Sequence, residues 1–171
     1  MFINDTIGPY IGVFIEWGFL MTFLFNLVAR LNNPDKTIVQ LSFMMAFSYI
    51  ISDFFRLSYS NYLNWLIYDL LTIAVIFVWF IYCKRQRFTA LYYILLGLAL
   101  NSFLMLITHY DIYILHNLEP WWLWTVYSYG VNIVDLLMIV ALVTEKDFLL
   151  VQKVIDKSNM LYLYKRISLS K

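Results

Sequence analysis

Five long apolar runs constrain the fold of this chain more than any other feature of its sequence. They cover residues 9–31, 38–55, 62–83, 89–108 and 121–143, with short polar segments between them. A helix rises about 1.5 Å per residue, so each run can cross a hydrocarbon layer of about 30 Å. The chain is 63% hydrophobic and 13% charged, whereas soluble domains average about 45–50% and about 25%. The sequence therefore predicts an all-α integral membrane protein, a bundle of five transmembrane helices.

Basic residues predict how this bundle is oriented. Of the 12 Lys and Arg residues, all but Arg56 fall on one side of a five-span arrangement. Cytoplasmic loops carry an excess of Lys and Arg, so the amino terminus is expected outside and the carboxyl terminus in the cytoplasm. The first segment has no basic residue before its apolar run, so that run is interpreted as a retained span and not as a signal peptide. A four-span arrangement would divide the basic loops between the two sides.

Polar residues recur within the apolar runs at helical spacing. In four of the five runs they follow one another at three- or four-residue steps, which places them on one face of each helix. We expect these faces to meet one another or a shared cavity. The members that form the candidate site are Glu16, Asp69, Asn101, Ser128, Asn132 and Asp135.

The buried acids permit two interpretations. An ionised side chain at the centre of a bilayer costs roughly 2.5–3.5 kcal/mol on insertion scales, and no basic residue lies at the depth of these acids. They are expected to be protonated unless water or a cation reaches them. On one interpretation they form hydrogen bonds between helices. On the other they line an outward-opening path, and the protein is a non-enzymatic component that passes or senses protons or small cations.

Small residues indicate where helices approach one another closely. Gly8 and Gly12 are spaced by four residues on the polar face of the first run, and Gly97 lies on that of the fourth. Small residues at this spacing allow two helices to pack closely in lipid. We therefore predict that Gly8, Gly12 and Gly97 are helix-packing positions.

The carboxyl-terminal segment, residues 144–171, is predicted to be a cytoplasmic helical tail that continues the fifth helix. Such a helix docks on a membrane, a neighbouring subunit or a soluble protein. This supports a rival function, in which the protein is a membrane anchor or sensor subunit that recruits a cytoplasmic effector. The candidate docking residues of the tail are Phe148, Val151, Ile155, Lys165 and Arg166.

Signals for enzymatic chemistry are weak. His109, Asp111, His116 and Glu119 lie together in sequence, but their spacing matches no metal-binding motif, so no metal site is predicted. The chain has no HExxH, GxSxG or glycine-rich phosphate loop, and Cys83 is its single cysteine. We expect no enzymatic activity, no cofactor and no nucleic-acid partner.

The expected surroundings of the protein are a lipid bilayer and other copies of itself. Five spans with short loops offer limited internal surface for burying four polar faces, which favours a homo-oligomer. The compact chain and its short loops suggest a bacterial inner membrane.

Overall fold

Five helices form nearly all of the structure. The computed structural model describes residues 8–82, 88–119, 121–147, 150 and 153. The helices are α1 (Gly8–Ala29), α2 (Thr37–Phe54), α3 (Asn61–Tyr82), α4 (Thr89–His109) and α5 (Trp122–Thr144), and the short π-helix η1 (Tyr110–Ile114) extends α4. All five α-helices are long and apolar enough to cross a membrane. The predicted all-α, multi-pass architecture is confirmed, and the predicted span limits agree with the helices to within two residues.

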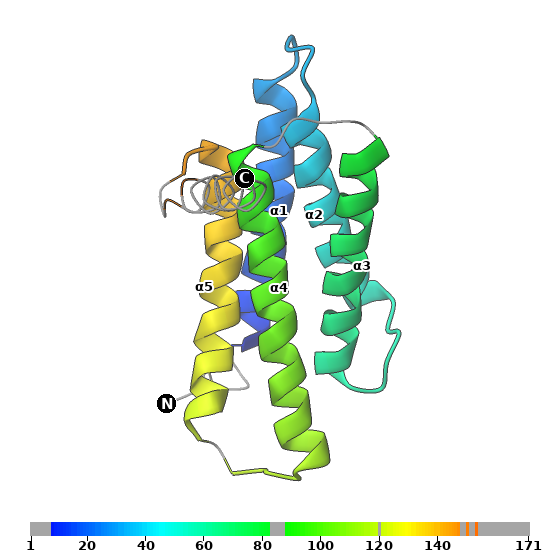
Figure 1. Cartoon of the computed structure of the whole chain (residues 1–171), viewed down its shortest axis with the longest axis vertical. Coiled ribbons are helices and arrows are strands. Elements are labelled where there is room, and N and C mark those ends of the chain that lie inside the picture. The colour runs from blue at the N-terminus through cyan, green and yellow to red at the C-terminus, as the bar shows by residue number, and fades with distance from the viewer. Residues whose placement is uncertain (1–7, 83–87, 120, 148–149, 151–152, 154–171) are drawn as a thin grey trace, which may run out of the picture.

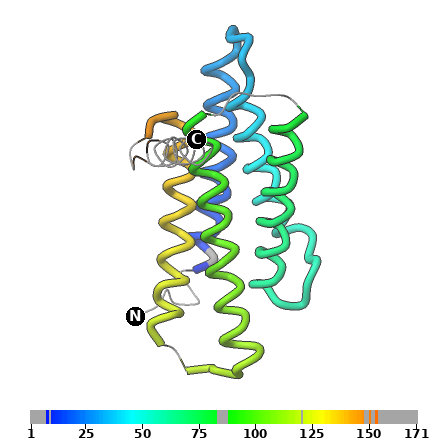
Figure 2. The backbone as a smooth tube through the Cα atoms, viewed as in Figure 1, coloured from blue at the N-terminus to red at the C-terminus, as the bar shows by residue number. Residues whose placement is uncertain are grey.

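The helices form a closed ring. Each one packs against its neighbours in the chain, and α5 completes the ring by packing against α1. Figures 1 and 2 show the chain running up and down, with α1, α3 and α5 antiparallel to α2 and α4. Consecutive spans joined by short loops favour this up-and-down arrangement. As a consequence, each helix turns one face toward a common interior.

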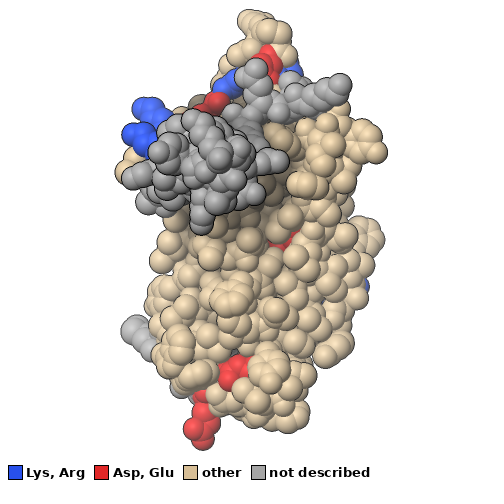
Figure 3. Space-filling model, in the orientation of Figure 1, with Lys and Arg blue, Asp and Glu red and all other residues tan. Residues whose placement is uncertain are grey.

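The two ends of the ring differ in charge. At the end where α1 and α5 finish, here called the basic end, Arg30 forms an ion pair with Glu145, and Lys36 Nζ donates to the carbonyl oxygen of Leu31 (2.9 Å). The opposite end, called the acidic end, holds Asp111 and Glu119. On the face seen in Figure 3, Lys and Arg side chains gather mainly at the basic end, whereas acidic side chains are seen at both ends, including the opposite tip.

The packed apolar core lies in the half of the ring nearer the basic end. All five helices contribute side chains that are at most 1% exposed. These include Phe19, Leu41, Met45, Ile76, Ile94, Leu98, Met138 and Leu142. Side chains packed at such density leave few voids as large as a water molecule. This half of the interior is therefore closely packed.

The glycines correct one prediction about helix packing. A Cβ atom added at Gly97 would lie 2.5 Å from Met138 Sδ and 3.2 Å from Val134 Cγ1, so α4 and α5 are close there. A Cβ atom at Gly12 would meet nothing within 4 Å, and both Gly8 and Gly12 line a cavity. The prediction that Gly12 packs against another helix is therefore wrong.

The end of α5 corrects a second prediction. Glu145 adopts a left-handed backbone conformation (φ 54°), and its N–H donates to the Ala141 carbonyl oxygen (3.0 Å). A left-handed residue after the last turn ends a helix, so α5 does not run on into the tail as one rigid element. The ion pair of Glu145 with Arg30 holds this turn against the end of α1. The predicted docking residues Phe148, Val151, Ile155, Lys165 and Arg166 lie outside the described residues.

Substituting valine at the two glycines tests this packing. Gly97→Val should lower the free energy of unfolding by about 1–3 kcal/mol, because the added atoms overlap Met138 and Val134. Gly12→Val, the matched control, should change it by less than about 0.5 kcal/mol, because its side chain enters open space. Denaturant unfolding in micelles measures both. Equal losses at the two positions would contradict the structure.

Candidate functional site

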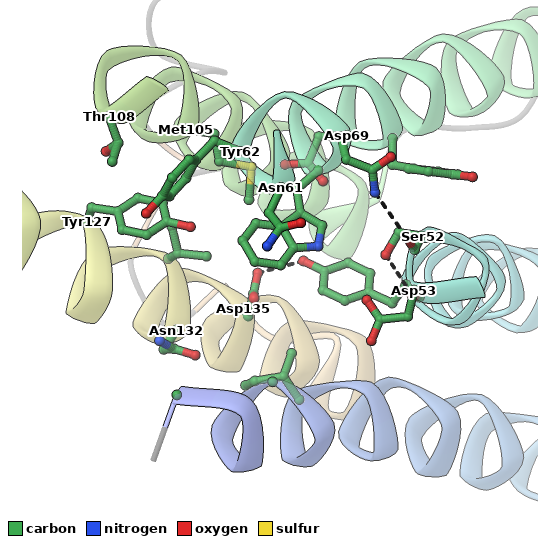
Figure 4. A pocket seen from close by; sticks show the side chains of 18 of the residues that line it. Ser52, Asp53, Asn61, Tyr62, Asp69, Met105, Thr108, Tyr127, Asn132 and Asp135 are labelled. Atoms are coloured by element: carbon green, nitrogen blue, oxygen red, sulfur yellow. Dashed lines mark hydrogen bonds between the residues drawn. The ribbon is translucent and has the colours of Figure 1, made fainter. Parts of the chain in front are cut away.

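The half of the ring nearer the acidic end contains a partly open cavity of about 920 Å³, to which all five helices and η1 contribute. Its volume lies at the upper end of the range for small-molecule sites, about 300–1,000 Å³. Figure 4 shows labelled side chains from several helices around this space. Five of the six predicted site residues line it: Glu16, Asp69, Ser128, Asn132 and Asp135.

Asp135 is the centre of a hydrogen-bond cluster deep in this cavity. Its Oδ1 accepts one bond from the Tyr49 hydroxyl group (2.6 Å) and another from Asn101 Nδ2 (2.7 Å). Asp135 is 4% exposed and Asn101 is fully buried. The Tyr49 ring also packs on Phe19, with centroids 4.3 Å apart. One carboxylate oxygen thus joins α2, α4 and α5, and the tyrosine extends the contact to α1.

Asp69 approaches the same space from α3 but lacks such partners. It is 6% exposed, and its Oδ2 is buried without a hydrogen-bond partner among the described residues. The charges of Asp69 and Asp135 are close enough to interact. Leaving a buried acceptor unpaired costs about 1–3 kcal/mol, and more when the group is charged. Asp69 therefore has an unused acceptor beside a second carboxyl group.

A second acidic pair lies between α1 and α2. The carboxyl groups of Glu16 and Asp53 are close enough to interact. Both residues line the cavity, together with Arg56, which follows the end of α2. The lining thus contains four carboxyl groups and one guanidinium group.

Aromatic rings form much of the remaining wall. The Tyr62 ring lies between two others, with its centroid 5.4 Å from that of Tyr127 and 6.4 Å from that of Trp65. Tyr68 and Trp124 line the cavity as well. Sequence reasoning named none of these aromatic residues as members of the site and so missed this wall.

The second helix also contributes more than the sequence reasoning predicted. Tyr49, Ser52, Asp53 and Arg56 all line the cavity. Tyr49, Ser52 and Asp53 follow one another at steps of three and one, so they lie on one side of α2, and Arg56 follows just after the helix ends. The helical-phase test that located the polar faces of the other spans would have found this face too.

Two predicted residues have roles other than the expected ones. Asn101 stands behind the cavity wall and contacts it through Asp135. Asn132 lines the cavity, but its Nδ2 donates to the Ser128 carbonyl oxygen of its own helix. The polar face of α5 is therefore partly satisfied within the helix, and Asp135 is its link to other helices.

Hydrogen bonds at the acidic end hold the cavity wall in place. Asn64 donates to the Ser52 carbonyl oxygen (3.0 Å) and accepts from the Leu57 N–H (2.7 Å), which fixes α3 against the end of α2. The buried Asp111 accepts from Trp121 Nε1 (2.8 Å) and Trp124 Nε1 (3.1 Å). These bonds secure the loop between η1 and α5. In the part of the chain that the structure describes, no group of His, Cys, Asp and Glu residues could hold a metal ion.

Comparison with known proteins gives no relative for this arrangement. No protein-family model, curated protein or solved structure matches the chain. The function must therefore be argued from the site.

A double-mutant cycle tests the Asp135 cluster. The Tyr49→Phe and Asp135→Ala substitutions should be coupled by about 0.6–2 kcal/mol in unfolding free energy, because they remove the two halves of one interhelical hydrogen bond. Tyr68→Phe is the control, since its hydroxyl group donates to the Phe55 carbonyl oxygen instead (2.9 Å). Its coupling to Asp135→Ala should be near zero. Similar couplings for both tyrosines would show that the Tyr49 bond is not specific.

Proposed function

We propose that the protein is a non-enzymatic membrane protein that captures small cations in its acid-lined cavity, as a sensor or as one state of a carrier. The observation that carries this proposal is the buried carboxyl group of Asp69, which lines the cavity, interacts with the charge of Asp135 and has no hydrogen-bond partner at Oδ2 among the described residues. Acids inside a membrane protein most often mark an ion or substrate path. A cation at this position would supply the missing partner.

The charges of the lining support a cation over an anion. The lining contains four carboxyl groups and one basic side chain, that of Arg56. Asp69 and Asp135 are deeply buried, where charge interactions are stronger than in water. Arg56 is exposed at the end of α2, where water screens its charge. The deepest part of the cavity therefore favours positive charge.

The packed core favours capture over an open channel. Between the cavity and the basic end, the interior is filled by residues such as Leu41, Ile94 and Leu142, which are fully buried. Buried polar side chains are few there, namely Thr22, Asn26 and Ser42, and transfer of a cation among the apolar ones would cost many kcal/mol. Conduction through this conformation is not expected, so a transporting role would require the helices to rearrange.

The orientation that we propose places the cavity on the outer side of the membrane. Arg30, Lys36 and Lys146 lie at the basic end. The excess of Lys and Arg in cytoplasmic loops assigns that end to the cytoplasm. Cations would then enter from outside, at the end where α1 begins.

Ligand-induced stabilisation tests the proposed function. The purified protein in nanodiscs is titrated with sodium, potassium, calcium and alkylammonium chlorides while its melting temperature is recorded. At least one cation should raise the melting temperature in a saturable way, because a ligand of the folded state adds RT ln(1 + [L]/Kd) to stability. Asp69→Asn should remove most of the effect, because it removes the charge beside the unpaired oxygen.

Glu119→Gln is the matched control. It removes one acidic charge at the same end of the bundle, but Glu119 does not line the cavity. Its melting temperature should respond to cations as the wild-type protein does. The proposal would be overturned if no cation stabilised the wild-type protein, or if Asp69→Asn and Glu119→Gln responded alike.

A further inference from the structure

We infer that the cation held in the cavity is a small organic ammonium ion, bound between the Asp69 carboxylate and an aromatic wall. This inference rests on the proposed function and narrows its ligand to one chemical class. The wall is formed by Tyr62, Trp65 and Tyr127, and is called the ring wall below.

The size and ligands of the cavity argue against an inorganic ion. The space of about 920 Å³ is far larger than a single metal ion requires. Calcium takes six to eight oxygen ligands at about 2.3–2.6 Å, and magnesium requires a near-octahedral site. Among the described residues, no three His, Cys, Asp or Glu side chains converge closely enough to hold a metal. A cation that fills this space must therefore carry apolar groups as well as its charge.

The position of the ring wall relative to Asp69 supports an ammonium group. Trp65 precedes Asp69 by four residues on α3, so its side chain lies on the same helix face, one turn closer to the acidic end. Tyr62 lies about one turn beyond Trp65, and Tyr127 reaches it from α5. The faces of such rings attract cations, with tryptophan the strongest, and alkyl or aryl groups pack against them as well.

These groups together define how the ligand would lie. An ammonium N–H would donate to the carboxyl group of Asp69, which lines the cavity and has no hydrogen-bond partner at Oδ2 among the described residues. Asp135 would add negative charge nearby, with its Oδ1 held in position by Tyr49 and Asn101. The organic part of the ligand would extend along the ring wall toward the acidic end. The interaction requires both a positive charge and an apolar body, which separates it from a metal site and from a purely apolar pocket.

Three ligands of related structure test this inference. Calorimetric titrations of the protein in nanodiscs use 2-phenylethylammonium, its uncharged analogue 2-phenylethanol, and potassium, with empty nanodiscs to subtract partition into lipid. The ammonium ion should bind at least tenfold more tightly than either of the others. This comparison uses the wild-type protein and so does not depend on any variant.

Variants then locate the site. Asp69→Asn and Trp65→Leu should each weaken binding of 2-phenylethylammonium by about tenfold or more. Trp79→Leu is the matched control on the same helix, because Trp79 lies outside the cavity and its Nε1 donates to Gln40 Oε1 (3.2 Å). Glu119→Gln controls for the loss of an acidic charge. Both controls should bind as the wild-type protein does, and circular dichroism should show every variant folded.

Each other outcome is informative. If potassium binds as tightly as the ammonium ion, this inference is wrong while cation capture stands. Equal binding of 2-phenylethanol would show that the cavity does not recognise charge, which overturns the inference. Undiminished binding by either folded Asp69→Asn or folded Trp65→Leu would also overturn it. If no cation binds at all, both the inference and the proposed function fail.

Discussion

The burial of Asp135 is the constraint on which the rest of the structure depends. A carboxyl group inside an apolar bundle must find hydrogen-bond donors, and Asp135 finds them in Tyr49 and Asn101, on two other helices. Because one oxygen accepts both bonds, α2, α4 and α5 are held at a fixed separation about this point. The cavity extends from this cluster toward the acidic end, and packed apolar side chains fill the interior toward the basic end.

This division explains how a short chain can combine stability with a large internal space. Side chains such as Leu41, Ile94 and Leu142 pack the basic half, where the Arg30–Glu145 ion pair also links α1 to the end of α5. The acidic half is held at its rim by the bonds of Asn64 and Asp111. An oligomer was predicted because one chain was expected to offer too little internal surface for burying four polar faces. The ring of helices buries these faces within one chain, so their burial does not require an oligomer.

The sequence predicts local features of this protein well. Span limits follow from hydropathy, which depends on each segment alone, and polar faces follow from the 3.6-residue period. For this reason the sequence predicted that Glu16, Asp69 and Asp135 face a shared interior, and all three line the cavity. The cavity wall formed by α2 was missed, although the spacing of Tyr49 and Asp53 carried the same signal.

Features that depend on distant residues could not be read in this way. Gly12 has the spacing of a packing position, but the space beside it is open because the cavity lies there. The sequence near Thr144 contains no signal that predicts the end of α5. In the structure, Glu145 contacts Arg30, which lies 115 positions away in the chain. The ring wall likewise brings Tyr62 and Trp65 on α3 to Tyr127 on α5. Such contacts form only when the ring of helices closes, and the hydropathy of the separate segments does not predict them.

The accessibility of single cysteines to water tests most directly the claim that the acidic half is open and the basic half sealed. Ser128→Cys and Leu98→Cys are compared in a Cys83→Ser background, using a membrane-impermeant thiol reagent on right-side-out and inverted vesicles. The cavity-lining position 128 should react from the outer side alone, and the fully buried position 98 from neither side. Reaction at position 98, or no reaction at position 128 in a folded variant, would contradict the account.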